Sequence, residues 1–331
     1  MSKKRYSGIG GQAVMEGIMM RNKEKYSVAV RKSDGEIEVM TGTYEPPIPE
    51  KITSLPFIRG TFVMINSLVL GMKTLGWSAE FFEEDEEEGA EKDSEKNSEK
   101  DSEKGSADTS KKEDKEKGIS PLMMGLTVCF SLVLSLGLFM FLPYFLSELL
   151  RNVVKSNTLI LIFEALLKLI IFVAYVAAIS LMDDIKRVYM YHGAEHKCIN
   201  CVENGMELNV ENVMKSDRLH PRCGTSFMVF VLIVSIILFM FIQTDSRLMR
   251  FVIRLVLIPV IAGISYEIIR WAGSSSNPIV KILSMPGLCV QKLTTREPDE
   301  KMAEVAIRAV EEVFDWRAYL QELKEKDGEL P

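Results

Sequence analysis

Residues 119–147 read ISPLMMGLTVCFSLVLSLGLFMFLPYFLS and contain no charged side chain. A helix needs about 20 mostly apolar residues to cross the hydrocarbon core of a bilayer, so this stretch is long enough to span. Three further apolar runs follow it, at residues 156–182, 223–244 and 248–271. The sequence therefore predicts a mainly α-helical multi-pass membrane protein with four transmembrane helices.

Two of these runs carry charged residues that a span must accommodate. Glu164 and Lys168 are four residues apart, so a helix brings them to one face, where they can pair away from lipid. In the fourth run, Arg250 and Arg254 are expected to extend their side chains to the membrane interface. With these two provisions, all four runs remain compatible with spanning.

The orientation follows from the basic residues that flank the spans. Loops 148–155 and 245–250 carry two Lys or Arg residues each, whereas residues 183–222 carry six: Lys186, Arg187, Lys197, Lys215, Arg218 and Arg222. Cytoplasmic loops carry the excess of Lys and Arg. We therefore expect a cell-membrane protein with a cytosolic loop at 183–222 and with both the N- and C-termini in the cytosol.

Residues 1–82 form a separate N-terminal region. Residues 26–31 and 37–44 alternate in polarity around Asp34-Gly35, which predicts a β-hairpin. An apolar helix is expected over residues 55–82. Its uncharged centre between Arg59 and Lys73 is 13 residues long, which favours an interfacial or re-entrant helix over the alternative, a fifth span.

An acidic linker separates this region from the first span. Residues 83–118 hold 16 acidic and 8 basic side chains, and Glu-Lys-x-Ser occurs four times in succession from Glu91 to Ser106. A segment without apolar residues cannot offset its ordering entropy, so we expect a disordered spacer. The alternatives are an acidic metal-buffering or protein-docking segment and a helix of paired Glu and Lys, against which the Ser, Gly and Asp content argues. The net charge of −6 leaves +2 outside this linker, which argues against a nucleic-acid partner.

The cytosolic tail, residues 272–331, contains one amphipathic helix. Pro298 is placed to begin it. Its apolar residues recur at the spacing of a single helix face: Met302, Val305, Ala306, Ala309, Val310, Val313 and Phe314. This face is expected to pack on the cytosolic loop or on the hairpin.

All three histidines lie within 29 residues of one another, in the 183–222 loop. His192 and His196 bracket Glu195 in the pattern His-x-x-Glu-His, and a helix would put both histidines on one face. This is the spacing of inverted zincins, in which two histidines bind zinc and the glutamate acts on water. His220 and Cys223 end the loop and Glu267 ends the fourth span, so all three are candidates for completing a metal site.

Simpler interpretations of these residues stand beside the metal site. Interfacial histidines often act only as polar anchors, and Glu267 can pair with Arg270 or with a basic residue from another span. The five cysteines are expected to be reduced thiols. Cys198 and Cys201 form a Cys-x-x-Cys that, with His196 or Cys223, would make a closed structural zinc site instead of a catalytic one.

Four motifs in this order resemble the YqhQ-like family of bacterial membrane proteins, a family of unknown function described as predicted metal-dependent enzymes. The motifs are GGQAVMEG at 10–17 with MMR at 19–21, YHGAEHK at 191–197, HPRCGTS at 220–226 and LTTREP at 293–298. The resemblance covers about residues 5–82 and 120–316. In the first motif, Gln12 and Glu16 are polar groups that can face the loop site; a plain Gly-rich entry to the hairpin is the alternative.

These observations lead to two hypotheses from different classes. The first is a metal-dependent membrane enzyme, a zinc hydrolase acting at the cytosolic face on a membrane lipid or a membrane-protein segment. One zinc or other divalent transition metal ion would be held by His192 and His196 plus His220, Cys223 or Glu267, in that order of preference. Glu195 would be the general base.

The second hypothesis is a non-enzymatic assembly or scaffold protein, in which a structural metal site pins the loop and a membrane protein is the partner. A transporter is disfavoured, because Glu164, Lys168 and Glu267 are too few to form a polar path through the bilayer.

Overall fold

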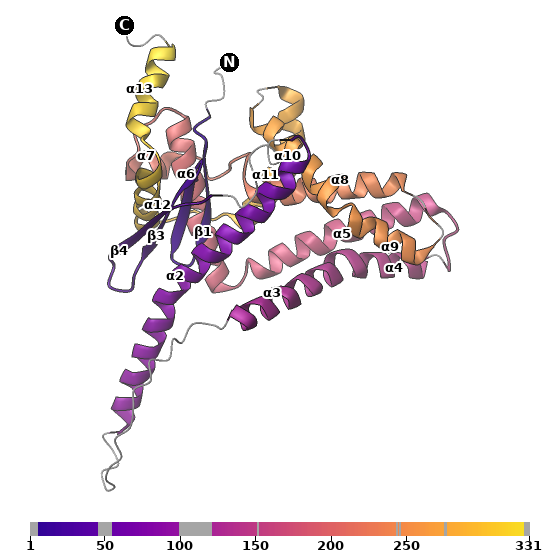
Figure 1. Ribbon diagram of the computed structural model, residues 1–331, viewed down its shortest axis with the longest axis horizontal. Helices are drawn as coiled ribbons and strands as arrows, with labels where there is room; N and C mark the ends of the chain where they lie inside the picture. The colour runs from indigo at the N-terminus through magenta and orange to yellow at the C-terminus, as the bar shows by residue number, and fades with distance from the viewer. Residues whose placement is uncertain are drawn as a thin grey trace. The chain divides into compact units, whose positions relative to one another are not determined.

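The computed structural model describes residues 6–45, 55–98, 121–150, 152–242, 244, 246–274 and 277–327. The chain divides into two units, one of residues 1–81 with 173–331 and the other of residues 82–172. Figure 1 shows the elements of each.

The N-terminal part of the first unit is a four-stranded antiparallel sheet in the order β1-β2-β3-β4. The predicted hairpin is confirmed as β3 (Lys25–Arg31) and β4 (Ile37–Thr43). Gly35 lies between them with φ +89°, a backbone conformation that glycine adopts without steric cost. The GGQAVMEG motif is itself a hairpin, β1 (Ile9–Val14) and β2 (Gly17–Asn22), with Met15 and Glu16 at the turn.

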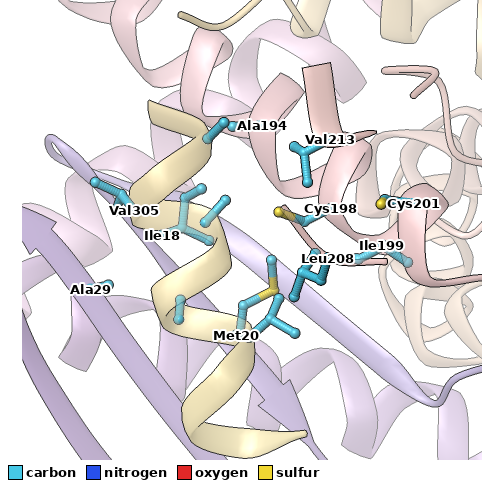
Figure 2. Close-up of a cluster of buried hydrophobic side chains, with 14 of the residues drawn as sticks. Ile18, Met20, Ala29, Ala194, Cys198, Ile199, Cys201, Leu208, Val213 and Val305 are labelled. Carbon is cyan, nitrogen blue, oxygen red and sulfur yellow. The ribbon is translucent and has the colours of Figure 1, made fainter. Parts of the chain in front are cut away.

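One face of the sheet is covered by α6 (Asp183–Glu203) and α12 (Glu300–Val313). Figure 2 shows Ile18, Met20 and Ala29 of the sheet together with Ala194, Cys198 and Ile199 of α6 and Val305 of α12. The predicted C-terminal helix and its buried face are therefore confirmed. It begins two residues later than Pro298 would place it, because the Asp299 side chain accepts the Met302 N–H and caps the first turn. Two short helices flank this core, α7 (Val210–Lys215) and α13 (Trp316–Asp327).

The other face of the sheet meets α2 (Ile58–Ser98). Gly71 of α2 lies against the Gln12 side chain, and Lys73 donates to the Tyr26 hydroxyl at 3.2 Å. The helix predicted over 55–82 is thus present but longer, so residues 83–98 of the predicted disordered linker are helical. Glu and Lys are good helix formers, and extending an existing helix avoids the cost of nucleation. Residues 99–118 of that linker lie outside the described residues.

Three helical segments in the described part of the chain are long and apolar enough to cross a membrane. They are Gly125–Leu150, formed by α3 (Pro121–Leu136), the π-helical η1 (Gly137–Phe141) and α4 (Leu142–Leu150); Thr158–Ile179 of α5 (Asn157–Ile179); and Gly224–Phe241 of α8 (Gly224–Phe241). Within α5, Glu164 and Lys168 pair at 3.0 Å, as predicted.

The fourth predicted span is broken. α9 (Arg247–Val256) and α10 (Ile258–Ser274) meet at a bend of 42°. Neither helix is counted as a span by itself, whereas the two together are long and apolar enough to form one. Pro259 follows the break, and proline cannot donate the hydrogen bond that would continue α9. Arg254 does not extend outward as expected; it is buried, with its guanidinium 5.0 Å from the centre of the Phe239 ring. One more helix, α11 (Pro278–Thr294), packs against α8.

Candidate metal centre

Helix α6 carries the His-x-x-Glu-His pattern and is continuous through Gly193. The rings of His192 and His196 lie on one face, with centroids 4.4 Å apart. A Cβ at Gly193 would lie 2.0 Å from the Arg296 carbonyl oxygen, and the Arg296 N–H donates to the Tyr189 carbonyl at 2.9 Å. Glycine is therefore needed here because the main chain of the LTTREP motif crosses α6 at this position.

Main-chain carbonyls orient both histidine rings. His192 Nδ1 lies 2.8 Å from the Thr294 carbonyl oxygen, and His196 Nδ1 lies 2.7 Å from the Arg218 carbonyl oxygen. A carbonyl accepts but cannot donate, so each Nδ1 carries the proton and each Nε2 presents a lone pair. His196 Nε2 is buried and has no hydrogen-bond partner. Histidines that ligate metals are held in this way, with the second nitrogen donating to an outer partner.

Cys223 supplies the third donor. It is the N-cap of α8, and its Sγ lies 3.1 Å from His192 Nε2. One donor atom each from His192, His196 and Cys223 lies within 4.8 Å of the others. Donors at ~2.0–2.3 Å from a tetrahedral zinc ion are roughly 3.3–3.6 Å apart, so a small side-chain adjustment suffices to fit the ion. An imidazole, imidazole and thiolate set suits zinc or a related transition metal.

Glu195 lies beside this donor set. It is almost fully buried, and its Oε2 has no hydrogen-bond partner. Burial raises the pKa of the Glu195 carboxyl to about 6, and the nearby His192 and the Gly11 N–H only partly oppose this shift. A carboxylate with a pKa near the working pH can both take and return a proton.

His220 is close to the donor set but does not belong to it. Its ring centroid is 5.7 Å from that of His196, while its Nε2 lies 3.6 Å from Glu203 Oε2 and 3.3 Å from the Arg222 guanidinium. Burial lowers the pKa of His220 to about 4, which keeps the ring neutral at physiological pH. His220, the preferred third ligand of the sequence analysis, is thus turned toward Glu203, whereas Cys223, the second preference, lies with His192 and His196 in the group that could hold an ion.

Glu267 is held elsewhere. Its carboxylate forms a bidentate pair with the guanidinium of Arg59 on α2, with one contact of 2.6 Å between Arg59 Nε and Glu267 Oε1. The sequence predicted an ion pair with Arg270 or with a basic residue from another span; the structure shows an ion pair, and its partner is Arg59 of α2, the helix predicted to be interfacial. The structure does not bring Glu267 into the donor set.

Cys198 and Cys201 lie in the apolar core of the unit. Both are fully buried, and Figure 2 shows them among Ile199, Leu208 and Val213. The Cys201 thiol points to the Glu207 carbonyl at 3.4 Å. These two cysteines are not part of the donor group found among the described residues, so the closed site built on Cys-x-x-Cys is not formed.

A cavity of about 520 Å³ opens onto the donor set. Its lining includes all three donors and Glu195. Residues of β1, α2 and α10 complete it. Gln12 faces this cavity, as the first motif suggested, whereas Glu16 does not line it and instead pairs with Arg187. The motif therefore forms one wall of the site.

The carbonyls of Thr294 and Arg218 were missed by sequence reasoning. A main-chain carbonyl has no residue signature, so no pattern could have identified these two groups. The LTTREP motif was the available signal, because it contains Thr294.

Comparison with known proteins gives a family but no activity. Residues 55–316 match the family described as "Protein of unknown function (DUF1385)". The chain is 36% identical over 312 residues to the "Uncharacterized protein YqhQ" of Bacillus subtilis (strain 168), and the match covers 92% of each chain. No solved structure matches. The family match and this identity confirm the resemblance seen in the motifs, and the chain belongs to the DUF1385 family.

Proposed function

We propose that this protein is a membrane hydrolase that uses one zinc ion, held by His192, His196 and Cys223. The observation that carries the proposal is the buried, unpartnered Nε2 of His196, in a residue whose donor atom lies within 4.8 Å of those of His192 and Cys223. A buried polar atom without a partner costs about 1–3 kcal/mol, and a bound cation would remove that cost. When bound, zinc supplies a Lewis acid that polarises a carbonyl and makes water more acidic.

The chain's own residues supply proton transfer and positioning. Glu195 takes a proton from the attacking water and returns it to the leaving group, and the Gly11 N–H holds the carboxylate toward the cavity. The carbonyls of Thr294 and Arg218 keep both imidazoles in one tautomer.

Three protein donors favour an enzyme over the scaffold hypothesis. Structural zinc sites are closed by four protein ligands, whereas catalytic sites keep one position open for water or substrate. Among the described residues, the donor group has three members, and the neighbouring His220 is turned toward Glu203.

The cellular setting completes the proposal. The apolar segments and the six basic residues of 183–222 support a multi-pass cell-membrane protein with the metal centre and both termini in the cytosol. A site next to membrane-spanning helices suits a substrate at the interface, either a lipid head group or a membrane-protein segment.

Metal content of the detergent-purified full-length protein tests the site directly. We expect about one zinc per chain by elemental mass spectrometry, and its loss in His196→Ala. Cys198→Ala is the matched control, because it alters a buried residue of the same helix outside the donor group. A folded, chelator-free preparation without metal would remove the basis of the proposal.

The role of Glu195 needs a separate variant. Glu195→Gln keeps the shape of the side chain but cannot accept a proton, so we expect normal zinc content and loss of in-cell function. If Glu195→Gln remained functional while His196→Ala did not, the site would be structural and the scaffold hypothesis would replace the enzyme.

A further inference from the structure

One edge of the sheet borders the cavity. Five consecutive residues of β1, from Ile9 to Ala13, line it. Alternate side chains of a strand point to opposite faces, so a consecutive run reaches one cavity only along an edge. β1 is the terminal strand of the sheet, and Gly10 and Gly11 expose its main chain because they lack side chains.

The odd-numbered residues of β1 direct their main-chain groups away from β2. The Ile9 N–H donates to Ser7 Oγ at 3.3 Å, and the Gly11 N–H donates to the Glu195 carboxylate. In the turn that follows β1, the Met15 N–H donates to Ser78 Oγ at 3.2 Å. In an antiparallel pair, such residues alternate with those bonded to the partner strand. Ala13 continues this series, so its N–H and C=O face outward, and no described residue bonds to either group.

The cavity walls near this edge are largely apolar. They include Val63 and Met64 of α2 and Phe227 of α8. Arg222 also lines the cavity, but its guanidinium pairs with Glu203 and lies 4.5 Å from the centre of the Tyr6 ring. Its charge is therefore already matched, which disfavours a phosphate-bearing ligand and favours an uncharged one.

We infer that the substrate is an extended, mainly apolar polypeptide segment that adds to β1 as a fifth strand. Strand addition of this kind uses main-chain hydrogen bonds for affinity. The peptide residue opposite Ala13 accepts a hydrogen bond from the Ala13 N–H and donates one to the Ala13 C=O. This pairing places the peptide beside the Glu195 carboxylate, which lies next to Gly11. The inference rests on the proposed function: water adds its hydroxyl to the peptide carbonyl carbon, the C–N bond breaks, and the remaining proton goes to nitrogen, which yields a carboxylate and an amine.

Binding of peptide hydroxamates to the full-length, cobalt-loaded protein in detergent tests this inference without a turnover assay. A hydroxamate placed on cobalt changes its visible spectrum, so each affinity can be read by titration. We expect a tripeptide hydroxamate of alanine and leucine to bind at least about 100-fold more tightly than acetohydroxamate. N-methylation of the amide that faces β1 should weaken binding about tenfold, while N-methylation of the next amide should change it little.

A pair of variants reports the same contact from the protein side. Ala13→Pro removes the outward N–H at an edge position that tolerates proline, and Ala13→Val retains it. We expect only Ala13→Pro to lose the tenfold sensitivity to N-methylation. Because the peptide series uses unaltered protein, the test stands even if Ala13→Pro fails to fold.

Three results would overturn the inference. Equal affinity for the peptide hydroxamates and acetohydroxamate would exclude strand addition and leave the metal site intact. Stronger competition by glycerophosphoethanolamine than by the peptide would make a lipid head group the substrate. No spectral response to acetohydroxamate, or no bound cobalt, would refute the proposed function itself.

Discussion

Gly193→Ala tests how the metal centre is held. In an ordinary helix interior this change stabilises by about 1 kcal/mol. Here the new Cβ would lie 2.0 Å from the Arg296 carbonyl oxygen. Carbon and oxygen make contact at about 3.3 Å, so the 294–298 main chain must move by roughly 1 Å. Overpacking costs about 1–3 kcal/mol, and a backbone obstacle argues for the upper end, so we expect a net loss of about 2 kcal/mol.

The same displacement moves the Thr294 carbonyl away from His192 Nδ1, which it now contacts at 2.8 Å. Loss of an outer partner to a ligating histidine weakens metal binding by about 10–100-fold. We therefore expect Gly193→Ala to lower both the thermal midpoint and the zinc affinity, measured by differential scanning fluorimetry and by chelator competition. The matched control is Gly76→Ala in α2, where an added Cβ meets no atom within 4 Å and should be neutral or stabilising. If Gly193→Ala matched Gly76→Ala in both measurements, the close crossing at α6 would be refuted.

Three further predictions follow from the contacts around the site. Burial alone would raise the pKa of Glu203, but His220 and Arg222 outweigh it and lower that pKa to about 2. Because the pKa of Glu203 is lower in the folded state, its carboxylate stabilises the fold above pH 4.5, the usual pKa. This stabilisation is lost as the pH falls toward 2. Glu203→Gln should thus cost about 3 kcal/mol at pH 7, and the difference from wild type in denaturant unfolding should shrink between pH 4.5 and pH 2. Glu267→Gln should leave the zinc content unchanged in elemental analysis, because Glu267 pairs with Arg59; loss of zinc would return it to the ligand set. Cys223→Ser should lose zinc while Cys201→Ser keeps it, and the reverse result would restore the Cys-x-x-Cys site.

Much of the fold follows from periodicity and turn chemistry. The buried face of α12 was predicted because its apolar residues recur at helical spacing, and the β3–β4 hairpin because Asp34-Gly35 marks a turn. The β1–β2 hairpin was not predicted, since Gly10, Gly11 and Gln12 lack the β-branched and aromatic residues of typical strands. The linker prediction failed over 83–98 because composition does not report whether a preceding helix continues.

At the site, the sequence singled out the residues that the structure brings together as possible donors, but not how they are arranged. His192 and His196 share a face because of their spacing, and Cys223 was a candidate because it precedes an apolar run. Whether the ring of His220 turns toward the donors depends on Glu203 and Arg222, and the partner of Glu267 lies 208 residues away in Arg59. Long-range contacts of this kind leave no mark on local spacing.

The carbonyls that hold the two histidines have a consequence for how the family can diverge. Every residue type offers a carbonyl, so no single substitution at position 218 or 294 deletes the group that orients His196 or His192. Sequence change at these two positions is therefore a poor guide to whether a relative still orients these two imidazoles in the same way. The vulnerable positions are those that fix the path of the backbone, and Gly193 is one of them, because every other amino acid would place a Cβ against the Arg296 carbonyl there.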